Sequence, residues 1–139
     1  MTYDLDRFVS AQADVYDGAL AELRSGRKES HWMWFVFPQI AGLGRSETAR
    51  FYAIQDAGEA RAYLAHPVLG PRLIEATEAV IAAPSTAEAV LGGIDAIKLR
   101  SSMTLFAAVA EDPKPFVAAL DRFFGGGPDD VTLATLNAG

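Results

Sequence analysis

The sequence contains no cysteine, and this absence excludes two common ways of stabilising a small protein. Without cysteine there is neither a disulfide framework nor a thiolate zinc site. A reducing cytoplasm is the compartment that suits such a chain, so we expect a cytoplasmic protein. Only two histidines are present, and neither has a carboxylate at metal-ligand spacing, so we predict no metal and no cofactor.

Long apolar runs and clusters of positive charge are also missing. No stretch approaches the roughly 20 apolar residues that a transmembrane helix needs, and the first residues lack the basic start of a signal peptide. The net charge is −6 and the 12 Lys and Arg residues are spread along the chain. Because nucleic acids and anionic membranes are bound by clustered basic side chains, we expect no general nucleic-acid binding and no membrane association.

What the sequence does have is apolar residues in helical periodicity. Half of the 139 residues are hydrophobic, which is enough for one domain spanning residues 1–139 with its own core. Apolar positions recur at intervals of three and four residues through most of the chain, and no alternating strand pattern is found. We therefore predict an all-α fold, a single compact domain of about seven helices.

Several residues mark the helix ends. Gly26 stands where a left-handed C-cap is expected, and Ser46 can cap the start of a helix. Asp56 and Glu59 have the spacing of a capping box, and the glycines at 125–127 predict a stop.

The segment at 30–44, SHWMWFVFPQIAGLG, is the most distinctive part of the chain. It contains both tryptophans, and no charged residue lies between Glu29 and Arg45. A short helix ended by Pro38 and an extended segment are both compatible with it. Because such an uncharged segment is too short to cross a membrane, it must be buried or must line a pocket.

Two interpretations of this segment stay open. Trp32 and Trp34 would lie about 200° apart on a helix, so they cannot point the same way. The segment can be a central core element in which His31 and Gln39 serve as polar partners of a buried indole. Alternatively, one tryptophan and His31 form the wall of a ligand pocket. The two roles can coexist.

The following residues, Gly42-Leu43-Gly44-Arg45-Ser46, lead directly into an expected helix. Two glycines, the helix start and the charge of Arg45 can form a cradle for a phosphate or carboxylate. A tight turn with Ser46 as N-cap explains the same residues.

Lys98 lies three and four residues before Ser101 and Ser102, so the three side chains can approach on one helix face. They can bind an anion, and a desolvated lysine can also act as a base for a serine nucleophile. In the structural alternative, Lys98 pairs with Asp95 and the serines permit close helix packing.

The chain resembles a bacterial family known as domain of unknown function 1810, whose members are sometimes labelled calpastatin. The matching motifs are FVxAQ at 8–12, ALxEL at 19–23, SHWMWFVFPQ at 30–39, GLG at 42–44 and KLRSSMTLF at 98–106. The resemblance implies an α-helical domain and no established reaction. In the order of its helical segments the chain is also similar to the small helical ADP-ribose-related N-glycosidase-like proteins.

These observations together predict a pocket beside the tryptophans that binds or hydrolyses a small anionic metabolite, such as a nucleotide or an ADP-ribose-like molecule. Histidine ionises near neutral pH, so His31 is a candidate acid or base, and Lys98 is the second catalytic candidate. Hydrolysis would break an N-glycosidic bond. The candidate binding residues are Trp32, Trp34, Gln39, Arg45, Ser46, Ser101 and Ser102. The alternative is a non-catalytic protein-interaction domain or homodimer that uses exposed aromatic side chains.

Overall fold

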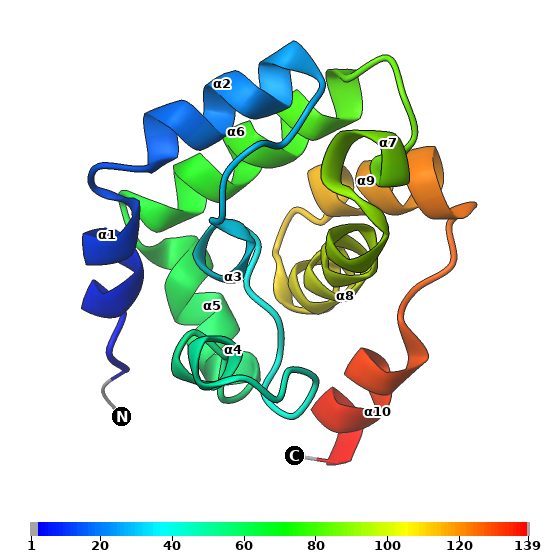
Figure 1. Cartoon of the computed structure of the whole chain (residues 1–139). Coiled ribbons are helices and arrows are strands. Elements are labelled where there is room, and N and C mark those ends of the chain that lie inside the picture. Colours follow the sequence, from blue (N-terminus) through cyan, green and yellow to red (C-terminus); the bar gives the residue numbers. More distant parts are fainter. Residues whose placement is uncertain (1–2, 139) are drawn as a thin grey trace.

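The computed structural model describes residues 3–138, and within them the chain is all-α and forms a single compact domain (Figure 1). Ten helices lie in this part of the chain, of which seven have seven residues or more and three are shorter. The helices are α1 (Asp6–Gln12), α2 (Tyr16–Ser25), α3 (Met33–Val36), α4 (Glu47–Phe51), α5 (Ala57–Ala65), α6 (Leu69–Ala82), α7 (Ala87–Leu91), α8 (Gly93–Val109), α9 (Lys114–Phe124) and α10 (Asp130–Ala138). The all-α prediction is confirmed. The described structure has slightly more helices than the predicted number of about seven.

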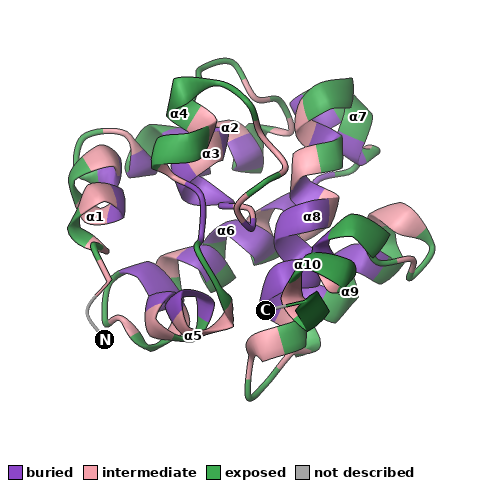
Figure 2. Ribbon diagram, turned by 90° about the horizontal axis from the view of Figure 1, so that it is seen from below, coloured by how far each residue is buried: buried purple, intermediate pink, exposed green. Residues whose placement is uncertain are grey.

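Helix α8 runs through the centre of the domain and contacts α5, α7, α9 and α10. Residues 101–106 are all buried, so the middle of α8 is enclosed on every side, as its purple colour shows in Figure 2. Its first turn is different, because residues 92–94 are exposed. The start of the central helix is therefore the part that remains accessible to a ligand.

Helices α2 and α6 pack together, as Figure 1 shows. The Tyr16 hydroxyl on α2 donates to Glu75 on α6 at 2.7 Å. Helix α2 ends at Gly26, whose φ of 82° is the left-handed conformation expected of a C-cap. This ending turns the chain toward α7, where the Lys28 amide donates to the Val90 carbonyl at 2.7 Å.

The aromatic segment crosses the interior as one short helix, α3, followed by an extended stretch. A buried amide fixes it: Gln12 Nε2 donates to the Phe35 carbonyl at 2.7 Å and lies 3.1 Å from the Tyr63 hydroxyl. Further on, Ile40 and Ile54 form an isolated parallel β-bridge. Because these polar contacts lie inside the core, they fix the position of the segment within it.

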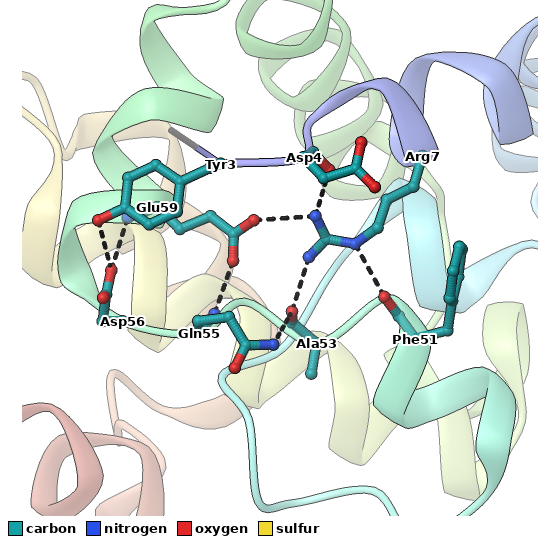
Figure 3. Close-up of polar contacts among 8 residues, drawn as sticks. All are labelled: Tyr3, Asp4, Arg7, Phe51, Ala53, Gln55, Asp56 and Glu59. Carbon is teal, nitrogen blue, oxygen red and sulfur yellow. Dashed lines mark hydrogen bonds and ion pairs between the residues drawn. The ribbon is translucent and has the colours of Figure 1, made fainter. Parts of the chain in front are cut away.

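A buried arginine ties α1 to the chain around α4 and α5 (Figure 3). Arg7 Nη1 lies 2.9 Å from Glu59 Oε2. The Arg7 side chain is 8% exposed and the Glu59 side chain is 1% exposed. Arg7 also donates through Nε to the Phe51 carbonyl and through Nη2 to the Ala53 carbonyl. Glu59 accepts from the Gln55 amide at 2.7 Å. Each charged group is thus satisfied, which indicates a structural clamp.

No helix within residues 3–138 is long and apolar enough to span a membrane.

Candidate functional site

A pocket of about 390 Å³ opens where the aromatic segment meets the turn between α7 and α8. Its walls are formed by Lys28, His31, Trp32, Met33, Trp34, Leu91, Gly92, Gly93, Ile94, Asp95 and Lys98. The volume lies within the range of small-molecule sites, which is about 300–1,000 Å³. Four residues expected at the site, His31, Trp32, Trp34 and Lys98, meet here.

The floor of the pocket is the beginning of α8. Gly92 has a φ of 91° and ends α7 while it caps α8, and no side chain caps this helix. Helix α8 therefore begins at Gly93. This start places Asp95 in the first turn, where the helix dipole favours a carboxylate.

Three charged side chains converge on this floor. Asp95 Oδ2 lies 2.9 Å from Lys28 Nζ, and Asp95 Oδ1 lies 3.5 Å from Lys98 Nζ. The Lys28 side chain is 9% exposed and that of Lys98 is 24% exposed. Two ammonium groups share one carboxylate, so the cluster has a net positive charge. The expected Lys98–Asp95 pair is present in this cluster.

Aromatic rings flank the ammonium groups. Lys98 Nζ lies 5.2 Å from the ring centroid of Trp34, and Lys28 Nζ lies 5.3 Å from that of Trp32. Both distances are within cation–π range. The His31 ring is 6.5 Å from the Trp34 ring, and its residue is exposed. Trp34 is partly exposed, so its ring can contact a ligand.

Trp32 has a different role, because it is fully buried. Its indole Nε1 donates to Glu22 Oε1 at 2.9 Å, and Lys28 covers the ring on the pocket side. Trp32 therefore forms part of the pocket wall, and its ring supports the Lys28 side chain. The two tryptophans both line the pocket and differ in exposure, since Trp32 is buried and Trp34 is partly exposed.

Glu22 on α2 holds the loop that carries His31. Its carboxylate accepts from the Glu29 amide, the Ser30 amide and the Ser30 hydroxyl, at 2.7, 3.0 and 2.6 Å, in addition to the Trp32 indole. Burial alone would raise the pKa of Glu22, but the Ser30 hydroxyl and the other three donors lower it to about 2. The carboxylate is ionised at neutral pH and orders this wall of the pocket.

The structure does not bring the remaining candidates to this pocket. The Gln39 carbonyl accepts from the Ile54 amide in the β-bridge, and Gln39 is not among the pocket residues. Ser46 accepts from the Ala49 amide at 3.1 Å and so caps α4, as the turn interpretation predicted. Arg45 is exposed and lies outside the pocket. This pocket therefore does not join all of the residues expected at one site, and Ser46 in the loop at 42–46 serves the short helix α4.

The two serines on α8 are also separate from the pocket. Ser101 donates its hydroxyl to the Ile97 carbonyl at 3.2 Å, within its own helix. Ser102 is fully buried, and its hydroxyl has no hydrogen-bond partner within residues 3–138. Neither serine is hydrogen-bonded to Lys98 in the described structure, which removes the geometric basis for a lysine-activated serine.

Sequence reasoning missed two contributors, Lys28 and Glu22. Lys28 precedes the aromatic segment directly, but its partner Asp95 is far away in sequence, so no local pattern pairs them. Glu22 resembled an ordinary acidic residue on an exposed helix face. Within the described residues no three His, Asp or Glu side chains gather in a way that could hold a metal ion.

Comparison with known proteins agrees with this architecture. A family profile described as "Protein of unknown function (DUF1810)" matches residues 2–136. The chain belongs to this family. A crystal structure of another protein, the conserved hypothetical protein Rv1873 from Mycobacterium tuberculosis, is similar over 97% of each chain, with 51% sequence identity and a TM-score of 0.95. No curated protein matches the chain.

Membership in the DUF1810 family accounts for the helical domain and attaches no reaction to it. The similarity to the mycobacterial protein covers the aromatic segment and α8 together, since it extends over nearly the whole chain. The function has to be argued from the chemistry of the pocket.

Proposed function

We propose that this DUF1810 protein binds a small anionic metabolite that also carries a flat ring, such as a nucleotide, in the pocket beside Trp34. The observation that supports this is the position of Lys98. Its ammonium group is close to both a partly exposed indole and an accessible helix start. An anionic group at Lys98 and a planar group on Trp34 would then be bound at adjacent points.

The charges of the pocket favour an anion. Lys28 is largely buried and pairs with Asp95 through Oδ2, so one ammonium group offsets the carboxylate and the cluster keeps a net positive charge. Lys98 is farther from Asp95 and more exposed, which leaves its charge available to a ligand. The unpaired amides at the start of α8 add a partial positive charge on the same side.

Binding is better supported than catalysis. His31 and Lys98 remain the catalytic candidates, but His31 is exposed and no serine hydroxyl is hydrogen-bonded to Lys98 within the described residues. Hydrolysis of an N-glycosidic bond is therefore a separate hypothesis, which is tested by looking for free base after incubation with a bound nucleotide.

The protein-interaction alternative has weaker support. It requires exposed aromatic side chains, whereas Trp32, Phe35 and Phe37 of the motif are buried and Trp34 is only partly exposed.

The experiment is a titration with adenosine 5′-monophosphate, followed by tryptophan fluorescence and by calorimetry. We expect saturable binding to the wild type, and a K98A variant that binds about 10- to 100-fold more weakly, since a charge-assisted hydrogen bond contributes about 1.5–3 kcal/mol. K114A is the matched control, because Lys114 is exposed on α9 and lies outside the pocket. Equal weakening in both variants, or none in either, would contradict the assignment of Lys98.

A further inference from the structure

Asp95 is the one acidic side chain among the residues that line this pocket. Its two carboxylate oxygens have unlike surroundings. Asp95 Oδ2 forms a close ion pair with Lys28 Nζ at 2.9 Å. Asp95 Oδ1 lies 3.5 Å from Lys98 Nζ, a distance too long for a strong hydrogen bond. Oδ1 therefore retains capacity to accept a hydrogen bond, since an ionised carboxylate has about four acceptor positions.

The carboxylate is fixed in this position. Asp95 belongs to the first turn of α8, where the helix dipole stabilises a negative charge. Lys28 holds it from the other side, and the Lys28 amide is itself bonded to the Val90 carbonyl of α7. An incoming anion cannot simply displace Asp95 from both lysines, because the Lys28 side chain is 9% exposed.

A fixed carboxylate beside an anion-binding lysine has two opposite effects. It repels a bare anion, because like charges at short distance are unfavourable in a partly desolvated pocket. It attracts a hydroxyl group, which can donate to Oδ1 in a charge-assisted hydrogen bond. A ligand that carries both an anion and hydroxyl groups satisfies Lys98 and Asp95 together.

We propose that Asp95 makes the pocket selective for hydroxyl-bearing anions, with sugar phosphates and ribonucleotides bound in preference to bare or deoxygenated anions. This inference rests on the proposed function, since it assigns the second recognition contact of the same pocket. Lys98 holds the anionic group, Trp34 contacts the flat ring, and Asp95 accepts from the sugar hydroxyls between them.

The test compares three probes by calorimetry: adenosine 5′-monophosphate, its 2′,3′-dideoxy analogue and inorganic phosphate. On the wild type we expect the ribonucleotide to bind at least about tenfold more tightly than the dideoxy analogue, which corresponds to about 1.4 kcal/mol. In D95N the amide oxygen can still accept a hydrogen bond but the charge is gone, so we expect this preference to fall to about threefold, and inorganic phosphate to bind more tightly than to the wild type. D14N is the control for the same chemical change, because Asp14 is exposed and outside the pocket.

The outcomes separate the two claims. If none of the three probes binds, the proposed function is wrong, and the selectivity is lost with it. If the two nucleotides bind the wild type equally, or if D95N keeps the preference, the role of Asp95 is overturned while anion binding stands. Should D95N fail to fold because Lys28 loses its partner, the double variant K28M/D95N removes both charges and gives the same comparison.

Discussion

Replacing Arg7 by methionine removes the charge from the clamp between α1 and the α4–α5 segment while it keeps most of the aliphatic volume. The Glu59 carboxylate, 1% exposed, would then lose its only cationic partner within the described residues. Breaking a buried ion pair from one side costs about 3–5 kcal/mol, because an uncompensated charge is left behind. The Phe51 carbonyl loses its Arg7 donor in the same step, while the Ala53 carbonyl loses Arg7 and keeps Gln55 Nε2 at 3.3 Å. We therefore expect R7M to lower the free energy of unfolding by about 3–5 kcal/mol.

Urea unfolding, followed by circular dichroism, measures this difference directly. For a chain of this size the melting temperature should fall by about 10–20 °C. R27M is the matched control, since Arg27 is exposed and its side chain forms no ion pair in the described structure; we expect a change within about 0.5 kcal/mol. The reasoning is refuted if R7M costs less than about 1 kcal/mol.

A double-mutant cycle tests the origin of this cost. In E59Q the side chain remains an acceptor for the Gln55 amide but has no charge. If the orphaned carboxylate causes the loss, R7M/E59Q should be more stable than the sum of the two single variants by about 1 kcal/mol or more. Strictly additive effects would show that the two charges are not coupled.

Two further predictions concern the pocket wall and a close helix contact. Because the pKa of Glu22 is lowered from 4.5 to about 2, its hydrogen bonds stabilise the fold above pH 4.5 and are lost as the pH falls toward 2. The carboxylate is near the surface, so we expect about 1–2 kcal/mol of pH-dependent stability, absent in E22Q when unfolding is measured from pH 6 to 2. At Gly70, a Cβ atom would lie 2.1 Å from the Leu64 carbonyl oxygen, so G70A should destabilise by about 1–3 kcal/mol. G18A, where an added Cβ meets nothing within 4 Å, should be neutral or stabilising in the same thermal assay, and equal effects of the two variants would disprove the steric explanation.

The fold class could be predicted from the sequence because helix periodicity and capping are local. Ser46 and Asp56 cap α4 and α5 as expected, since they accept from the Ala49 and Glu59 amides at 3.1 and 2.8 Å. The capping box is only half formed, because the Glu59 carboxylate accepts from the Gln55 amide. Helix α7 is capped by Thr86, and α8 begins at Gly93. Single-turn helices such as α3 are too short to produce a periodic signal.

The candidate site was predicted only in part, because some of the residues that form it are far apart in the sequence. His31, Trp34 and Lys98 were selected for their chemistry, and they do meet in one pocket. Arg45 was expected to contribute its charge to an anion cradle at 42–46, but the fold does not bring it to the pocket. The Lys28–Asp95 pair joins the loop after α2 to the start of α8, and such long-range pairing is set by the packing of helices.

The central claim is that this pocket, rather than the loop at 42–46, binds the anion. The most direct measurement is a titration of ¹⁵N-labelled protein with adenosine 5′-monophosphate, followed by two-dimensional NMR. We predict that the Trp34 indole resonance and the amides of Gly92, Gly93 and Ile94 shift together with one dissociation constant, and that K98A raises this dissociation constant about 10- to 100-fold. Shifts confined to the amides of residues 42–46, or no shifts at any position, would contradict the account.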